Sequence, residues 1–215
     1  MTVANFLQPL TPIAVQPVAV EAIALVATAQ PSSRALSNFA MQRQLQENWC
    51  WAAVSTSVAV FFGATQWTQC KVAAAELGHD CCGDDASGPC NQPWYLDRPL
   101  TRVGHFDHMD FSSAPFTALR TEIDHGRPLC CRVQWSGGDG AAHFVALVGW
   151  IVAADGTEFV DVQDPYFDRV TIPYSQFVTA YRSPGDSWTH SYFTVTVAAV
   201  LAGAAGQIAN APKAG

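Results

Sequence analysis

Basic residues are scarce in this sequence, and their scarcity excludes one broad class of function. The chain has 11 Lys and Arg residues against 18 Asp and Glu residues, and its formal net charge is −7. The basic residues are scattered and form no run or stripe. Because proteins bind the phosphate backbone of nucleic acids mainly through clustered Lys and Arg, we expect no nucleic-acid partner.

The sequence also lacks the marks of a secretory signal and of a membrane span. No Lys or Arg precedes Arg34, so the positive start of a signal peptide is missing. The apolar stretch over residues 10–29 is interrupted by Pro12, Pro17 and Glu21, whereas a helical span needs about 20 consecutive apolar residues. We therefore expect no Sec-type signal and no membrane span, and the sequence leaves the localisation open.

What the sequence does have is enough apolar material for one substantial core. With 215 residues and 49% hydrophobic content, the chain is expected to form a single domain. We place this domain over residues 41–198. A Pro-interrupted lead-in over residues 1–40 precedes it, and a tail of small residues over 199–215 follows it.

Helical signals fill the first half of the domain, and strand signals fill the second. The sequence predicts four helices: Cys50 to Gly63, a helix capped by Thr68 and ending at Gly78, residues 94–103, and a helix capped by Ser113 with Pro115 in its first turn and Gly126 at its end. From residue 128 onward the apolar period changes to two, which predicts strands over residues 129–135, 142–152, 158–163 and 192–197. Helices first and antiparallel strands second is an α+β pattern.

Cys50 lies where a helix start would favour a thiolate. The first N–H groups of a helix are unpaired and carry the positive end of the helix dipole, so they stabilise an anion. The thiolate is the nucleophilic form of cysteine. The first helix is therefore a plausible place for a nucleophile, and a buried structural cysteine is the alternative interpretation.

The other six cysteines leave several pairings open. Cys70, Cys81, Cys82 and Cys90 surround one loop and allow three disulfide connectivities. Zinc is the rival interpretation, but the adjacent pair Cys81-Cys82 does not fit the two-residue spacing of structural zinc sites. We favour disulfides or free thiols, and we expect no metal and no cofactor. His105 and His108 form only a weak candidate metal pair, and the sequence leaves the state of Cys130 and Cys131 undecided.

Three segments resemble the active-site regions of papain-like cysteine peptidases. Gln44 lies six residues before the sequence Cys50-Trp51-Ala52, the segment HFVALVG begins at His143, and the segment DVQDP contains Asp164. The three segments occur in the order found in that family. The form NWCWAA and the Gly-rich run before the histidine are most similar to compact bacterial papain-like proteases, a group that includes type III effector proteases.

The resemblance implies a papain-like α+β fold, with a helical lobe that carries the cysteine and a β lobe that carries the histidine and aspartate. It implies a cysteine endopeptidase without a cofactor, acting through a thioester acyl-enzyme. Cys50 would be the nucleophile, His143 the general base and acid, Asp164 the orienting residue and Gln44 the oxyanion donor. The partners would be a protein or peptide substrate and, for an effector or toxin exported by a specialised system, an immunity or inhibitor protein.

Two departures from the papain pattern keep other interpretations open. Asn48 and Trp49 replace the usual Gly-Ser pair, and the histidine follows the cysteine by only 93 residues. Peptidoglycan endopeptidases and acyltransferases use the same residues on the same scaffold, and a non-catalytic binding module is a further alternative. The lead-in could inhibit or target the protease, or it could be a surface strand or linker.

The order of the residues also separates two candidate orienting acids, Asp161 and Asp164. A hairpin with a two- or four-residue loop around Asp155-Gly156 would pair residues whose numbers sum to 311 or 309. Because directly opposed residues share a face of the sheet, either register places Asp164 on the face of His143 and Asp161 on the other. We therefore predict that Asp164 orients the histidine.

Overall fold

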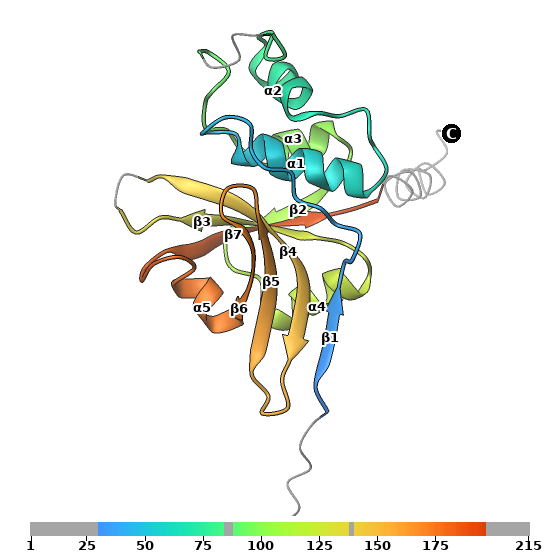
Figure 1. Cartoon of the computed structure of the whole chain (residues 1–215), viewed down its shortest axis with the longest axis vertical. Helices are drawn as coiled ribbons and strands as arrows, with labels where there is room; N and C mark the ends of the chain where they lie inside the picture. Colours follow the sequence, from blue (N-terminus) through green and yellow to red (C-terminus); the bar gives the residue numbers. More distant parts are fainter. Residues whose placement is uncertain (1–29, 84–87, 138–139, 197–215) are drawn as a thin grey trace, which may run out of the picture.

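The computed structural model describes residues 30–83, 88–137 and 140–196 of the chain (Figure 1). Seven antiparallel strands form one sheet in the order β2-β7-β3-β4-β5-β6, and β1 pairs with β4. Helices α1 to α3 lie over one end of the sheet, whereas α4 and α5 pack against its lower part (Figure 1). The predicted α+β class is therefore confirmed.

The first two helices form as their sequences predict. α1 (Cys50–Phe61) begins at the cysteine, and its Ala and Val residues other than Val60 are buried against the sheet and the other helices. α2 (Gln69–Leu77) is capped by Thr68, whose hydroxyl accepts a hydrogen bond from the Lys71 N–H. It ends at Gly78 in the left-handed conformation that favours glycine.

The next two helices differ from the prediction in their limits. α3 (Asp97–Arg102) is shorter than the expected 94–103. α4 (Phe116–Asp124) begins directly after Pro115, which occupies the N-cap position, and no side chain caps this helix. The expected Ser113 cap is wrong because this residue lies two positions before the N-cap. The last helix, α5 (Tyr174–Thr179), was not predicted.

The sheet contains three more strands than the sequence predicts. The expected strands are β3 (Leu129–Gln134), β4 (Ala142–Val152), β5 (Glu158–Asp164) and β7 (Ser187–Thr194). The last of these begins five residues before the predicted 192–197. The unexpected strands are β1 (Ser32–Ala35), β2 (Phe106–Asp110) and β6 (Asp168–Pro173). They are mostly exposed and lack the alternation of buried and exposed residues on which the prediction relied.

Part of the N-terminal lead-in belongs to the sheet. β1 lies within residues 1–40 and pairs with β4, with Ser32 opposite Val152 and Ala35 opposite Gly149. The chain then turns inward, so Leu36 and Phe39 are buried in the core. Residues 1–29 and the expected tail over 199–215 lie outside the described residues.

The β4–β5 hairpin reaches its register in an unexpected way. Ala153 N–H donates to the Thr157 carbonyl, which closes a three-residue turn with Gly156 at a φ of +85°. Near this turn Gly149 lies opposite Asp161 and Val152 opposite Glu158, so the numbers of paired residues have an even sum. The predicted odd sum is wrong there. A bulge between Leu147 and Gly149 then changes the pairing. Beyond the bulge Ala146 lies opposite Gln163, so the paired residue numbers sum to 309, which is one of the two predicted registers.

Two disulfides stabilise the cysteine-rich loop: one joins it to α2 through Cys70, and the other lies within the loop. Cys70 pairs with Cys82, and Cys81 pairs with Cys90. This is one of the three connectivities that the sequence allows, while Cys50, Cys130 and Cys131 are free thiols. Within the described residues, no helix has the length and hydropathy needed to cross a bilayer.

Candidate active site

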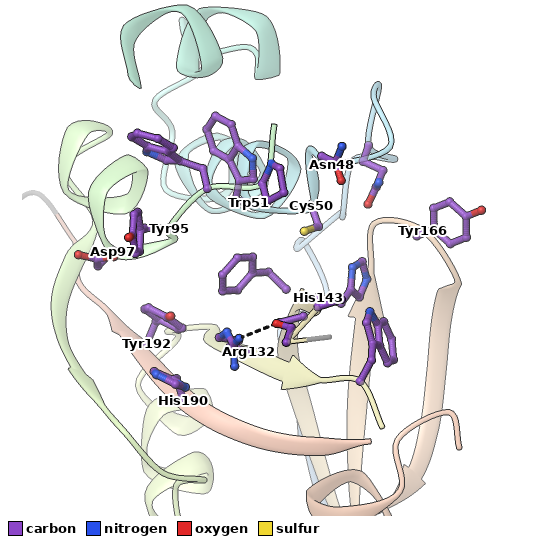
Figure 2. A pocket seen from close by; sticks show the side chains of 18 of the residues that line it. Asn48, Cys50, Trp51, Tyr95, Asp97, Arg132, His143, Tyr166, His190 and Tyr192 are labelled. Atoms are coloured by element: carbon purple, nitrogen blue, oxygen red, sulfur yellow. Dashed lines mark hydrogen bonds between the residues drawn. The ribbon is translucent and has the colours of Figure 1, made fainter. Parts of the chain in front are cut away.

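A cleft of about 1280 Å³ separates the helical part of the molecule from the sheet. The helical side contributes the start of α1 and the segment that leads into α3, and the sheet contributes residues of β3, β4 and β7. Cys50 and His143 face each other across this cleft (Figure 2). The cleft therefore brings together two of the predicted residues, which are 93 positions apart in the sequence.

Cys50 is the first residue of α1, as predicted. Its side chain is a free thiol that lines the cleft, although the residue is only 8% exposed. The N-cap residue Trp49 makes no side-chain hydrogen bond to the helix start. The unpaired N–H groups of the first turn therefore remain available to an anion beside Cys50.

His143 and Asp164 form a buried hydrogen-bonded pair. Nε2 of His143 lies 2.8 Å from Oδ1 of Asp164. The thiol of Cys50 also interacts with His143, and this interaction is one of the causes that raise the pKa of the imidazole. Asp161, the other candidate acid, instead binds Arg169 on β6 through Oδ1 at 2.8 Å and makes no contact with His143. The structure thus joins Cys50, His143 and Asp164 in one chain of contacts.

Several donors hold the Asp164 carboxylate in place. Oδ1 accepts hydrogen bonds from the N–H groups of Tyr166 at 2.7 Å and Phe167 at 2.9 Å, and Oδ2 accepts one from the Tyr181 hydroxyl at 2.8 Å. Arg182 lies at 3.9 Å from Oδ2. Sequence reasoning missed Tyr181, because only the packing of α5 against the sheet brings it to this carboxylate.

The contacts of His143 and Asp164 raise the pKa of the histidine and lower the pKa of the aspartate, and both shifts favour the charged forms. Burial by itself would lower the pKa of His143, but hydrogen bonds to Asp164 and Cys50 outweigh it and raise the pKa to about 9. Burial would raise the pKa of Asp164, yet the bond and charge of His143 and the two N–H groups hold it below its ordinary value. At neutral pH the imidazole is therefore protonated and the carboxylate is ionised.

Aromatic rings cover the histidine on two sides. Trp135 stacks on the His143 ring with 5.5 Å between ring centroids and 20° between planes. Phe167 meets the same ring edge-on at 6.1 Å. These rings limit the access of water to the His143–Asp164 bond, which strengthens that bond. No motif in the sequence marked Trp135 or Phe167. They cover His143 only because the sheet brings the residues that follow β3 and β5 next to the start of β4.

Gln44 lines the cleft near Cys50, but its amide donor is occupied. Nε2 donates to the carbonyls of Gln46 at 3.0 Å and Glu47 at 2.6 Å, while the buried Oε1 has no partner among the described residues. The backbone N–H of Gln44 donates to the Pro165 carbonyl at 3.0 Å, beside Asp164. The structure thus places Gln44 at the site, and a donor role there requires its amide to rotate toward the substrate.

The residues beside Cys50 are held by the segment that follows Cys90. The Trp49 and Trp51 indole N–H groups donate to the carbonyls of Cys90 and Gln92, at 2.6 and 2.9 Å. Asn48 donates two hydrogen bonds to Asn91, from its backbone N–H to Oδ1 at 2.9 Å and from its side-chain amide to the carbonyl at 3.1 Å. Its amide is therefore engaged with Asn91, and both tryptophans are buried in the core. Sequence reasoning missed Asn91, for which the adjacent disulfide cysteine was the only signal.

The two histidines of the weak candidate metal pair make separate contacts. His105 is buried, stacks on Phe62 and contacts the Val195 carbonyl through Nδ1. His108 is exposed, stacks on Phe193 and contacts Asp107. Neither histidine lines the cleft.

A cysteine at a helix start that faces, across a cleft between helices and a sheet, an imidazole hydrogen-bonded to a carboxylate is the arrangement of a cysteine protease of the papain type. The chain belongs to the family described as papain-like cysteine protease AvrRpt2, whose model matches residues 33–182. It is therefore a cysteine endopeptidase of the bacterial effector type, and its substrates are proteins.

Solved structures of similar fold include the Amb a 11 cysteine protease, a major ragweed pollen allergen, in its proform. Its 2.05 Å crystal structure is 13% identical to the chain with a TM-score of 0.48, and the match covers 80% of this chain and 67% of that protein. A 2.70 Å structure of the same proform matches with the same identity and TM-score, over 79% and 60% of the two chains. No curated protein sequence matches the chain significantly.

Proposed function

We propose that Cys50, His143 and Asp164 are the catalytic residues of this endopeptidase. The observation that carries the proposal is the 2.8 Å bond between His143 and Asp164, with Cys50 facing His143 across the cleft (Figure 2). A protonated imidazole held between a carboxylate and a sulfur is the arrangement that a thiolate nucleophile requires. All three residues lie within the part of the chain that the family match covers.

In the first half of the reaction, Sγ of Cys50 attacks the carbonyl carbon of the scissile peptide bond. His143 then gives its proton to the leaving nitrogen, so that the C–N bond breaks and a thioester remains on Cys50. Asp164 stays ionised and keeps the ring of His143 in the orientation that this transfer needs. The pKa of about 9 for His143 ensures that the proton is present at neutral pH.

In the second half, water replaces the leaving amine. The neutral imidazole of His143 takes a proton from water, the hydroxide oxygen attacks the thioester carbon, and the C–S bond breaks. The proton on His143 again pairs with the departing sulfur. The cycle closes with the carboxylic acid product released and Cys50 free.

The developing oxyanion requires donors near Cys50. The backbone N–H of Cys50, at the start of α1, is the first of these. Gln44 is the second in our proposal, once its Nε2 turns from the carbonyls of Gln46 and Glu47 toward the substrate. The Pro165 carbonyl holds the Gln44 backbone during this rotation, so only the side chain needs to move.

The family match extends the proposal to the biological setting. Members that act as effectors cleave proteins of another cell, and a producer of such an enzyme needs protection from it. We therefore extend the proposal to a delivered effector or toxin with a cognate inhibitor in the producer. Co-expression of candidate inhibitors with the active enzyme, compared with the Cys50→Ala variant, tests this extension.

A thiol-reactive epoxide probe tests the catalytic assignment directly. The probe should label the wild-type protein at Cys50, as located by peptide mass spectrometry, and cleavage of a denatured protein substrate should stop in proportion to labelling. Cys50→Ala should remain folded and should neither label nor cleave. Cleavage that persists in Cys50→Ala would assign the nucleophile to another residue.

A further inference from the structure

The cleft continues beyond the catalytic pair, over a part of the sheet that the reaction itself does not use. Arg132 on β3 and His190 on β7 are direct cross-strand partners, and both line this part of the cleft. Tyr192, two residues further along β7, lines it as well. The three side chains lie together on the floor of the cleft, away from Cys50 (Figure 2). We call this cluster of Arg132, His190 and Tyr192 the basic floor.

The guanidinium of Arg132 makes few hydrogen bonds within the protein. Nη1 donates to the Thr189 hydroxyl at 3.0 Å, and Nη2 reaches the Gly140 carbonyl only at 3.5 Å. Among the described residues, no carboxylate forms an ion pair with Arg132. Five other arginines in the same residues do have such a partner: Arg43, Arg102, Arg127, Arg169 and Arg182. Arg132 therefore presents a guanidinium to the cleft that no carboxylate of the described residues pairs with.

The two neighbours of Arg132 add donors to the same place. The His190 and Tyr192 rings stack with 13° between their planes and 6.4 Å between centroids. Burial keeps the pKa of Tyr192 above its ordinary value, so its hydroxyl holds a proton to donate. Burial and the charge of Arg132 lower the pKa of His190, and no carboxylate counteracts them. The surroundings of the basic floor are thus positive and rich in donors.

The opposite wall of the cleft carries an acid near this floor. Asp97 starts α3 and faces the floor across the cleft (Figure 2). It forms no ion pair with Arg132 or with another described residue. Its neighbour Arg98, which also lines the cleft, stacks on Tyr95 with 4.6 Å from its guanidinium carbon to the ring centroid. Among the described residues that line this end of the cleft, Arg98 and Arg132 outnumber Asp97; the other acid of the lining, Glu47, lies three residues before Cys50.

We propose that the basic floor is a specificity subsite that binds an acidic side chain of the protein substrate. The planar guanidinium of Arg132 matches a carboxylate in two parallel hydrogen bonds, and Tyr192 supplies a further donor. A substrate with Gln at the same position keeps the size and loses the charge. Because the subsite acts on the substrate of the proposed protease, this inference rests on the proposed function.

A proteome-derived peptide library provides the first measurement. Wild-type enzyme should cleave peptides with Asp or Glu enriched at one fixed position relative to the cut. The best peptide and its Glu→Gln counterpart are then compared by kcat/KM, and we expect the Glu peptide to be cleaved at least about tenfold faster, since a hydrogen bond to a charged group is worth that much or more. Arg132→Gln should bring the ratio between the two peptides close to one.

Two further variants sharpen the comparison. Asp97→Asn removes the repelling charge and should increase the Glu/Gln ratio. Arg120→Gln is the matched control, since Arg120 stacks on Trp150 and does not line the cleft. It should leave the ratio and the rate unchanged. Thermal unfolding of each variant separates a lost subsite from a lost fold.

The outcomes distinguish this inference from the proposed function on which it rests. Absence of cleavage by the wild-type enzyme would contradict the catalytic proposal. Efficient cleavage with no enrichment of Asp or Glu at any position, or an enrichment that persists in Arg132→Gln, would overturn the subsite alone. A preference for aromatic residues that Arg132→Gln leaves intact would assign the floor to apolar side chains instead.

Discussion

Asp164 accepts a 2.8 Å hydrogen bond from His143 although the hairpin that connects their strands starts in a register that would separate them. The one-residue bulge between Leu147 and Gly149 changes the pairing before the strands reach the site. Since successive residues of a strand point to opposite faces, this change decides which acid meets the histidine. The bulge therefore belongs to the active-site architecture.

The two candidate acids provide a matched pair of variants. Asp164→Ala should lower kcat at least about tenfold, because the ring of His143 loses its orienting partner. Asp161→Ala should leave kcat nearly unchanged, since this acid binds Arg169 outside the cleft. Initial rates with a saturating peptide substrate decide between them. A larger loss in Asp161→Ala than in Asp164→Ala would show that the orienting role is misassigned.

The pH dependence should report on His143. Its pKa of about 9 lies above the ordinary value of 6.5, so the folded state binds the proton more tightly than the unfolded state. The stability contributed by this proton is complete below about pH 6.5 and is lost as the pH rises through 9. Because the same proton goes to the leaving amine, kcat/KM should fall on the alkaline side near pH 9.

A pH–rate profile of kcat/KM checks this expectation. Asp164→Asn removes the carboxylate charge, so its alkaline limb should move to lower pH, whereas Asp161→Asn should keep the wild-type profile. An alkaline limb that is the same in both variants would mean that another group sets it.

The three free cysteines should differ in reactivity. Cys50 lines the cleft beside His143, whereas Cys130 and Cys131 are fully buried on β3, and burial raises the pKa of both thiols. Iodoacetamide at neutral pH should therefore alkylate Cys50 in the native protein and spare the other two. Peptide mass spectrometry at increasing times measures this order, and equal rates at all three sites would contradict it. Denaturant should make all three accessible.

The disulfides should differ in their effect on activity. Removing either one, as Cys81→Ser with Cys90→Ser or as Cys70→Ser with Cys82→Ser, should cost about 2–4 kcal/mol of unfolding free energy. Only the first pair should also lower kcat/KM several-fold, because Cys90 and the segment after it hold Trp49 and Trp51 on either side of Cys50, the proposed nucleophile. Activity and denaturant unfolding are measured at a temperature where both variants are folded. Equal activity losses in the two pairs would contradict a positioning role for this segment.

Much of the fold was predictable where the relevant interactions are local. The apolar stretch after Cys50 and the Thr68 cap with Gly78 predicted α1 and α2, because capping and side-chain burial act within a few residues. The polar edge strands β2 and β6 were not predictable in this way. They pair through backbone groups with β7 and β5, and backbone pairing leaves no mark on the pattern of side chains.

The sequence by itself determined the class of this protein, because the residues around Cys50, His143 and Asp164 are chemically specific and occur in the order of a papain-like protease. Only the tertiary structure decided how they meet. The bulge in β4 selected Asp164, the packing of α5 brought Tyr181 to its carboxylate, and the sheet placed Arg132 beside His190 in the cleft. These contacts join residues far apart in the chain, so they depend on strand register and packing, which no local pattern encodes.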